Sequence, residues 1–334
     1  MQSPRTSFVV TCHNLGAYLE EALDSLNAQT VSDHEVVVVN DGSDDAATCR
    51  LLAGLDRPAT QIVHSERLGL PGARNLGVAH ARGEFLCMVD ADDLLEPVYL
   101  ERSLETLGRD PGIAFASHWL RTFGDEEWEW APTDCAFPAL LQTNTVNGAA
   151  LMRRSMFERL AGFDETMVDG CEDWEFWIRA VAAGFSGVII PEFLFRYRRR
   201  SDSMSRTMER SPGYAALVRQ VVDRHADTFL RHLPAVLARN DQEIADRSVG
   251  AWQLDGEWSA HMEGQLTWLA DNQRAAETVR KVEAIEAALG ETRAEVHELH
   301  AGYMRELERN QALRNSLSWR LTAPLRALLD MVRR

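Results

Sequence analysis

Residues 5–90 alternate short apolar runs with amphipathic segments, and this alternation restricts the chain to few folds. Each run has the length of a buried strand, and each intervening segment carries its apolar side chains at helical spacing. Strands that are apolar along their whole length are typical of parallel sheets covered on both faces. The predicted fold is therefore α/β, with a Rossmann-like, mostly parallel sheet of the nucleotide-binding type. We expect strands at Phe8–Cys12, Glu35–Asn40, Gln61–His64 and Phe85–Val89, and helices at Tyr18–Ala28, Ala46–Leu55 and Gly72–Ala81.

The run that ends at Val89 leads directly into the carboxylates of Asp90, Asp92 and Asp93. Open α/β sheets bind ligands at the carboxyl ends of their strands. Asp90 and Asp92 can converge there on one hard cation, Mg²⁺ or Mn²⁺, whose coordination shell a diphosphate would complete. The same residues also suit a helix start capped by Asp92 or Asp93, so capping stays an open alternative.

Two familiar phosphate-binding loops are missing from the sequence. The first strand is followed by His13-Asn14-Leu15-Gly16 rather than GxGxxG, and no GxxxxGK[ST] occurs. A metal ion and cationic side chains would therefore have to neutralise a bound diphosphate. Asp41, at the end of the second strand, can accept a hydrogen bond from a pyrimidine ring N–H, or it can simply form a turn with Gly42.

Composition excludes several classes of protein. The net charge of -16 argues against a nucleic-acid partner, because binding phosphates requires a basic face. The 5 cysteines are scattered without CxxC pairs, which indicates reduced thiols and no structural zinc site. The sequence shows neither a signal-peptide pattern nor an apolar run of membrane-spanning length, so we expect a cytoplasmic protein.

Four segments carry a resemblance to a known family. In order, Thr11-Cys12-His13-Asn14, Val39–Asp45, Gly69–Gly77 and Met88–Asp93 resemble the successive motifs of family 2 glycosyltransferases with the A-type glycosyltransferase fold. The resemblance covers about residues 5–207 and implies an inverting, non-processive enzyme. It implies that Asp41 reads the nucleotide base and that Asp90 and Asp92 form the DxD element for the ribose and the metal-bound diphosphate. It also implies that the nucleotide sugar is bound by Thr11, His13, Asn14, Asp41, Arg74 and Asp90.

A second candidate site lies in the segment Gly170–Arg179, where a predicted helix begins with the acidic pair Glu172 and Asp173. Acidic residues are favourable at the positive end of a helix, and a carboxylate near a sugar donor can also deprotonate an acceptor hydroxyl. The residues alone leave capping and catalysis open. The family resemblance implies that Asp173 is the general base, with Glu172 and Trp174 on the acceptor side.

The basic stretch Tyr197–Ser205 departs from the family pattern. Relatives often carry a histidine where Arg200 stands, and that histidine can help to hold the metal and the diphosphate. Arg200 cannot bind a metal but can pair directly with a phosphate oxygen. A solvated basic run is the alternative.

The family resemblance implies a hexosyl- or deoxyhexosyltransferase, with UDP- or dTDP-sugars favoured over GDP-sugars as donors. The expected acceptor is a hydroxyl of a glycan or lipid-linked glycan in bacterial surface polysaccharide synthesis. The sequence lacks the QxxRW motif and the membrane spans that are expected in the processive synthases of this family. We therefore expect transfer of one sugar per encounter. The alternatives are a sugar nucleotidyltransferase and a non-catalytic coiled-coil scaffold.

Four regions are expected: a catalytic domain at 1–210, a helical extension at 211–270, a long helix or coiled coil at 271–317 and a basic amphipathic tail at 318–334. A seven-residue apolar register within 275–317 favours a homo-oligomer through a coiled coil. The alternatives are a long helix packed on its own catalytic domain and a partly disordered segment. The tail combines Trp319 with leucines and arginines, and can lie on the anionic inner face of the cell membrane or contact a partner protein. Within the catalytic domain, after the strands and helices given above, Ile113–Ser117 is expected to be a further strand. Trp119, Trp128 and Trp130 are expected in a loop or on the acceptor-side surface.

Overall fold

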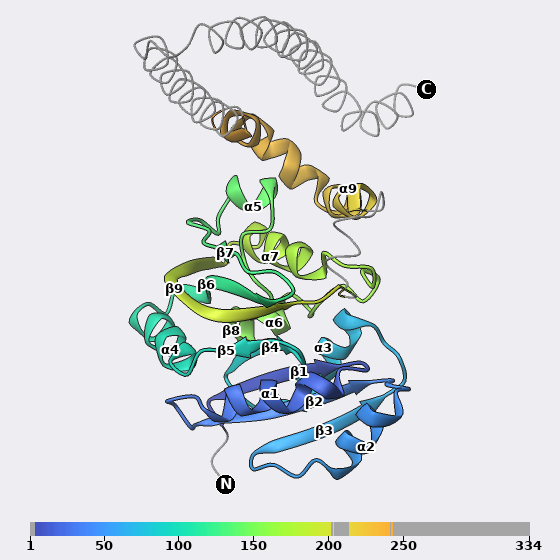
Figure 1. The fold of residues 1–334 in the computed structure, drawn as a ribbon. Coiled ribbons are helices and arrows are strands. Elements are labelled where there is room, and N and C mark those ends of the chain that lie inside the picture. The colour runs from blue at the N-terminus through green and yellow to red at the C-terminus, as the bar shows by residue number, and fades with distance from the viewer. Residues whose placement is uncertain (1–3, 202, 204–213, 241, 243–334) are drawn as a thin grey trace, which may run out of the picture. The chain divides into compact units, whose positions relative to one another are not determined.

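The computed structural model describes residues 4–201, 203, 214–240 and 242. Its sheet has the strand order β3-β2-β1-β4-β8-β6-β9-β5, and β7 pairs with β6 outside this path (Figure 1). The strands are β1 (Thr6–Cys12), β2 (His34–Asp41), β3 (Thr60–Ser65), β4 (Phe85–Asp90), β5 (Leu94–Leu95), β6 (Ile113–Gly124), β7 (Glu129–Trp130), β8 (Leu151–Arg153) and β9 (Ser186–Arg199). The helices are α1 (Gly16–Asn27), α2 (Ala46–Gly54), α3 (Leu70–His80), α4 (Tyr99–Arg109), α5 (Ala139–Gln142), α6 (Arg154–Arg159), α7 (Glu172–Ala182) and α9 (Tyr214–Arg224).

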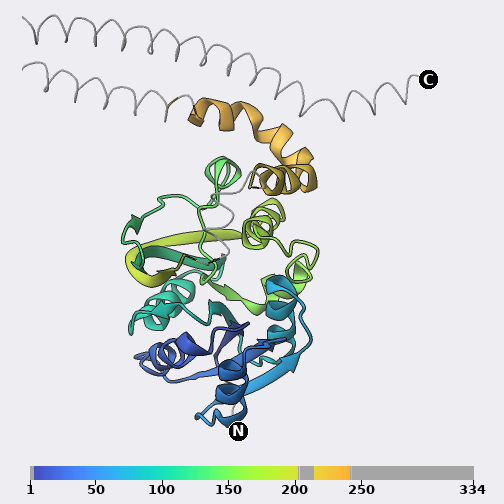
Figure 2. The same cartoon turned by 45° about the vertical axis from the view of Figure 1, so that its right-hand side comes forward.

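The predicted parallel strands are confirmed. Strands β3, β2, β1 and β4 lie side by side and run in the same direction, with Val10 paired to both Val38 and Val89. Successive side chains of a strand point to opposite faces of the sheet, so an unbroken apolar run needs helices on both faces. Figure 2 shows dark-blue α1 and teal α4 on one side of these strands and light-blue α3 on the other.

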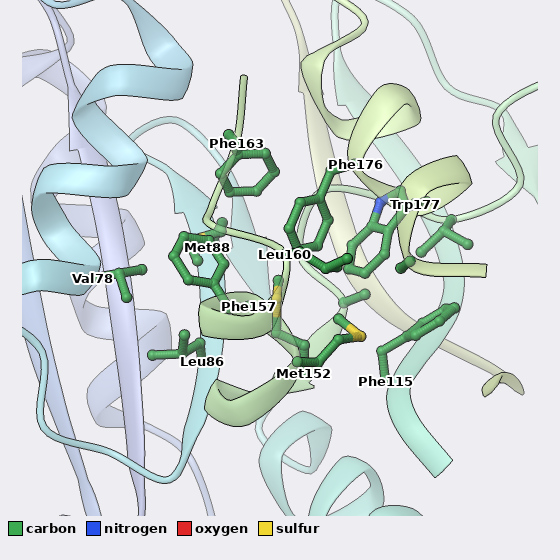
Figure 3. Packing of buried hydrophobic residues seen from close by; sticks show 14 of the residues in the cluster. Val78, Leu86, Met88, Phe115, Met152, Phe157, Leu160, Phe163, Phe176 and Trp177 are labelled. Atoms are coloured by element: carbon green, nitrogen blue, oxygen red, sulfur yellow. The ribbon is translucent and has the colours of Figure 1, made fainter. Parts of the chain in front are cut away.

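Two apolar clusters fill the two sides of the sheet. Phe8 and Val10 belong to one cluster, together with leucines of α1, α2 and α4. Val9 belongs to the other cluster, which contains side chains of α3, α6, α7 and α9. Figure 3 shows the aromatic part of this second cluster, where Phe176 and Trp177 of α7 lie near Phe157 and Phe115. The ring centroids of Phe115 and Trp177 are 4.9 Å apart, so α7 is fixed directly against strand β6.

The second half of the sheet differs from the expected pattern. Strand β8 was not predicted and pairs antiparallel with both β4 and β6, so the sheet is mixed. Strand β6 continues to Gly124, and Trp130 pairs with Leu120 through β7, so the prediction of a loop was wrong for Trp119 and Trp130. Strand β9 runs from Ser186 to Arg199 and so includes the first three residues of the basic stretch Tyr197–Ser205.

The described residues belong to the compact unit Met1–Asn240, apart from Gln242. Beyond the sheet, residues 214–224 and 226–240 are helical with a turn at His225, where the sequence predicted helices. The predicted coiled coil at 275–317 and the amphipathic tail at 318–334 lie outside the described residues, so self-association and membrane contact stay predictions. Among the helices that are described, none combines the length and the hydropathy needed to cross a membrane.

Candidate active site

A pocket lies at the carboxyl ends of the parallel strands, where the sequence placed a ligand site. We call it the strand-end pocket, and it is lined by Thr11, Cys12, His13, Leu15, Asp41, Arg67, Leu70, Ala73, Asp90, Asp92, Tyr197, Arg200 and Ser203. The fold therefore brings together residues from four strands, β1, β2, β4 and β9, that are far apart in the sequence. The predicted residues Thr11, His13, Asp41, Asp90, Asp92 and Arg200 all line this pocket.

The carboxylate of Asp90 is held at the end of β4 by two donors. The Thr11 hydroxyl donates to Asp90 Oδ1 over 3.0 Å, and Arg74 Nη2 donates to the same oxygen over 3.2 Å. The Asp90 side chain still keeps 31% of its surface exposed, so it can meet a ligand in the pocket.

The carboxylate of Asp92 pairs with the basic stretch that follows β9. Arg200 Nε donates to Asp92 Oδ2 over 2.9 Å. Burial and the nearby Asp90 charge raise the pKa of Asp92, and Arg200 only partly offsets this effect. The pair of carboxylates therefore keeps an affinity for further positive charge. The neighbouring Asp93 is buried and accepts a hydrogen bond from the Arg198 backbone N–H over 2.8 Å. This bond fixes the end of β9 to the turn that follows β4.

Asp41 ends β2 and organises the loop before α3. Its carboxylate accepts hydrogen bonds from the backbone N–H groups of Leu68 and Gly69, at 2.5 and 3.1 Å. His13 Nδ1 donates to the Asp41 carbonyl over 2.8 Å, which joins the two strand ends. Both side chains line the strand-end pocket.

Asn14 lies beside the strand-end pocket and is not among its lining residues. Its backbone is left-handed, with φ of 57°, and its side-chain oxygen accepts from the backbone N–H groups of Asp44 and Asp45. Asn14 therefore fixes the start of α2 against the loop after β1, and the structure does not bring its side chain into the pocket.

A second pocket adjoins the first and shares Leu70, Asp90 and Tyr197 with it. We call it the helix-end pocket, because the start of α7 forms one wall. The polar and aromatic side chains in its lining include Arg74, Asp90, Trp128, Trp130, Asn144, Asn147, Glu172, Asp173, Tyr197 and Arg199. A molecule that spans Asp90 would therefore occupy both pockets.

Asp173 is held in a fixed orientation in the first turn of α7. Its Oδ1 accepts from the Trp174 backbone N–H over 2.7 Å, and its Oδ2 accepts from Asn144 Nδ2 over 3.0 Å. Burial raises the pKa of Asp173, while Arg74 and these hydrogen bonds lower it, and the net shift is upward. A raised pKa brings a carboxylate closer to the basicity that proton abstraction at neutral pH requires.

Arg74 connects the two pockets. Its Nη1 donates to Glu172 Oε1 over 2.7 Å, while its Nη2 reaches Asp90, and the arginine itself is buried. Arg74 lies on α3, and α3 packs closely on β1 because Gly77 has no side chain. A Cβ at Gly77 would lie 2.2 Å from Val9 Cγ1. Burial and the Asp173 charge raise the pKa of Glu172 to about 7 even though Arg74 opposes the shift.

Trp174 is not brought into the helix-end pocket. The side chain is 4% exposed and packs in the cluster under α7, and its indole N–H donates to the Leu140 carbonyl over 2.7 Å. Two residues that do line the pocket, Asn144 and Tyr197, were not singled out from the sequence. Asn144 follows a four-residue helix with no recognisable motif, so only the three-dimensional contact with Asp173 reveals it.

The residues present fit a divalent cation that shares its coordination shell with a substrate. Among the described residues, no cluster of three or more histidine, cysteine or acidic side chains could hold a metal alone. Mg²⁺ is commonly bound through one or two carboxylates together with substrate phosphates and water. Asp90 and Asp92, with the raised pKa of Asp92, supply such a pair.

Comparisons with known proteins point to one family for the parallel half of the chain. The model of glycosyl transferase family 2 matches residues 7–161. The putative glycosyltransferase EpsH of Bacillus subtilis (strain 168) is 36% identical over 120 residues, which make up 35% of this chain and 35% of EpsH. The succinoglycan biosynthesis protein ExoO of Rhizobium meliloti (strain 1021) is 29% identical over 224 residues, 61% of this chain and 64% of ExoO.

Among solved structures, that of S. aureus TarS 1-349 in complex with UDP-GlcNAc has a TM-score of 0.51 at 19% identity, and the match covers 60% of each chain. At this identity the likeness concerns the fold alone. The chain thus spans about a third of the length of EpsH and less than two thirds of the length of ExoO.

Proposed function

The domain at residues 7–161 belongs to glycosyl transferase family 2 and has the predicted A-type glycosyltransferase fold, and on this premise we propose that the protein transfers a single sugar with inversion. The donor is a nucleotide-diphosphate sugar bound in the strand-end pocket. The acceptor hydroxyl enters the helix-end pocket. The observation that carries this proposal is that the two pockets meet at Asp90, with the fixed carboxylate of Asp173 in the wall of the second.

In the proposed reaction, Asp173 takes the proton of the acceptor hydroxyl as its oxygen attacks the anomeric carbon. The new glycosidic bond forms on the face opposite the nucleotide, and the bond between the anomeric carbon and the diphosphate oxygen breaks. The electron pair leaves with the nucleoside diphosphate, and the proton passes from Asp173 to solvent. Asn144 keeps the carboxylate turned toward the pocket throughout.

The negative charge that develops on the leaving diphosphate needs compensation. Arg200 lines the strand-end pocket and can pair with a phosphate oxygen when a donor is bound. A divalent cation held by Asp90 and Asp92 would neutralise the diphosphate further. Arg74 already forms ion pairs with Asp90 and Glu172. Its proposed role is therefore to fix the position of Asp90 relative to Glu172, and so of one pocket relative to the other.

The names of two similar proteins support a proposal for the acceptor and for the donor. ExoO takes part in succinoglycan biosynthesis, and TarS was solved with UDP-GlcNAc. We therefore propose a glycan or lipid-linked glycan as acceptor and a UDP- or dTDP-sugar as donor.

The donor site is tested by calorimetric titration with a panel of UDP-, dTDP- and GDP-sugars, with Mn²⁺ and with chelator. We expect one nucleotide class to bind, and Asp92→Ala to weaken the metal-dependent binding by about 10-fold or more, because one of the two carboxylates is lost. Asp110→Ala, at an exposed loop outside both pockets, is the matched control. Unchanged affinity in the Asp92 variant would remove this residue from the metal site.

The acceptor side is tested at Trp128, which lines the helix-end pocket and keeps 42% of its surface exposed. A flat, rigid aromatic face at a pocket mouth is well suited to pack against a sugar ring. We expect Trp128→Ala to raise the KM for the acceptor by about 10-fold, the effect of losing about 1.4 kcal/mol of contact, with donor affinity unchanged. Asp110→Ala, the exposed-loop control of the donor experiment, is the control here too. An increase in donor Kd instead would place Trp128 on the donor side.

A further inference from the structure

The helical residues 214–240 lie outside the part of the chain that matches the family, yet they contact the elements that hold Asp173. We propose that this segment, which we call the brace, is a positioning element of the active site that fixes the orientation of Asp173. The proposal rests on the assignment of Asp173 as the base.

The brace contacts the rear face of α7. Successive helix residues are rotated by about 100°, so Glu175 points about 200° away from Asp173 on the same helix. Glu175 is buried, and its Oε1 accepts from His225 Nε2 over 3.0 Å and from Arg179 Nε over 3.0 Å. The front of α7 therefore presents the carboxylate of Asp173 to the pocket while the brace holds its back.

The brace also holds α5, which leads into Asn144. Arg239 Nε donates to Gln142 Oε1 over 2.9 Å, and Gln142 Nε2 donates to Asn240 Oδ1. Two residues after Gln142, Asn144 donates to Asp173. Through α7 and α5 the brace thus supports the helix that carries the base and the amide that orients it.

Apolar packing anchors the brace between these polar contacts. Val221 is fully buried in the same cluster as Trp174 and Trp177, and Phe229 packs against that cluster. Arg224 adds a further polar contact, donating to Asp164 Oδ2 over 2.8 Å in the loop before α7. Polar side chains that pair across buried interfaces fix one arrangement of the elements, and small displacements of a catalytic group reduce rates strongly.

The test uses the full chain. His225→Ala combined with Arg239→Ala removes the side-chain contact of the brace to Glu175 on α7 and one of its two contacts to Gln142 on α5. His225→Gln combined with Arg239→Lys keeps a donor at each position. Arg219→Ala is the matched control, because Arg219 lies on α9, pairs with Asp223 on its own helix, and has a side chain that is 77% exposed.

Two readouts separate positioning from general destabilisation. The first is backbone hydrogen exchange in the peptide 172–178 compared with the peptide 6–12 in β1. The second is nucleoside diphosphate release from the UDP-, dTDP- and GDP-sugar panel, compared with the Kd of the free nucleoside diphosphates. In the double alanine variant we expect faster exchange at 172–178 alone and about tenfold slower turnover at unchanged Kd. The conservative pair should recover at least half of the turnover, and Arg219→Ala should change nothing.

Unchanged exchange and turnover in the double alanine variant would overturn the proposal. So would a parallel loss of turnover and nucleoside diphosphate affinity, or no recovery in the conservative pair. A wild-type protein that neither binds nor turns over any nucleotide sugar would instead refute the proposed function, while the exchange experiment would still report on the brace.

Discussion

Replacement of Asp173 by asparagine is expected to lower sugar transfer by about 10²- to 10⁴-fold, the usual contribution of a positioned general base. Asparagine preserves the size and planarity of the side chain, so the contacts of α7 with the core should survive. It cannot take up a proton from an acceptor hydroxyl. Because Asp173 lines the helix-end pocket and not the strand-end pocket, donor affinity should stay near the wild-type value.

The measurement is steady-state transfer together with calorimetric donor binding. The matched control is Asp169→Asn, an exposed acid four residues upstream that lines neither pocket. Transfer should also depend on pH with a definite sign. Burial raises the pKa of Asp173, so the rate should rise with pH over a range above that of an ordinary aspartate, as the carboxylate loses its proton. Full turnover in the asparagine variant would show that the base is another group.

Glu172 is the natural competitor for the role of base, since burial raises its pKa to about 7. Its position argues against the role. The Glu172 side chain is only 6% exposed and its Oε1 is bound by Arg74 over 2.7 Å. Proton transfer requires direct reach to the acceptor hydroxyl. Asp173 is less deeply buried in the wall of the same pocket, so it is the better placed of the two carboxylates.

The sequence predicted the parallel half of the sheet well because its signal is local. Each run such as Phe85–Val89 is apolar along its whole length, and the observed strand Phe85–Asp90 differs by one residue. The strand β8 was missed because three residues carry too little pattern, and its pairing with β4 and β6 is decided by contacts across the chain.

The candidate site shows the same division. Strand-end residues such as Asp90 and Asp41 could be placed because the ends of parallel strands meet at one edge. Side chains on α7 could not be placed so simply, because which of three successive residues faces the pocket depends on how the helix packs. Trp174 faces the core, where its indole N–H finds the Leu140 carbonyl. The contact between Asn144 and Asp173 joins residues 29 positions apart and leaves no mark in either local sequence.

Replacement of Arg74 by methionine is expected to cost about 3–5 kcal/mol of the free energy of unfolding, because it leaves a buried carboxylate without its cation. Glu172 bears most of this penalty, since its side chain is only 6% exposed. Asp90 is 31% exposed and solvent compensates it in part. For a unit of this size the midpoint of thermal unfolding should fall by about 2–4 °C for each kcal/mol lost.

The matched control is Arg82→Met. Arg82 also pairs with a buried carboxylate, that of Glu35, over 2.6 Å, but its own side chain is 63% exposed. Glu35 would keep the hydrogen bonds from the Ser7 hydroxyl and the Arg82 backbone N–H, so the loss should be about 1 kcal/mol or less. A loss as large as that of Arg74→Met would show that burial of the cation does not decide the cost.

Glu172→Gln provides the decisive partner variant. If the penalty of Arg74→Met comes from an uncompensated Glu172 charge, removing that charge in the same chain should recover about 0.5–3 kcal/mol relative to the sum of the single variants. The double variant should therefore unfold at a higher temperature than Arg74→Met alone. The affinity for the nucleotide sugar should be lower than in the wild type in both variants. In both, Asp90 has lost Arg74 Nη2, the hydrogen-bond donor at 3.2 Å that orients its carboxylate. Strictly additive losses would mean that Arg74 stabilises the fold by packing on Phe163, whose ring centroid lies 5.5 Å from the guanidinium carbon, rather than by joining the two carboxylates.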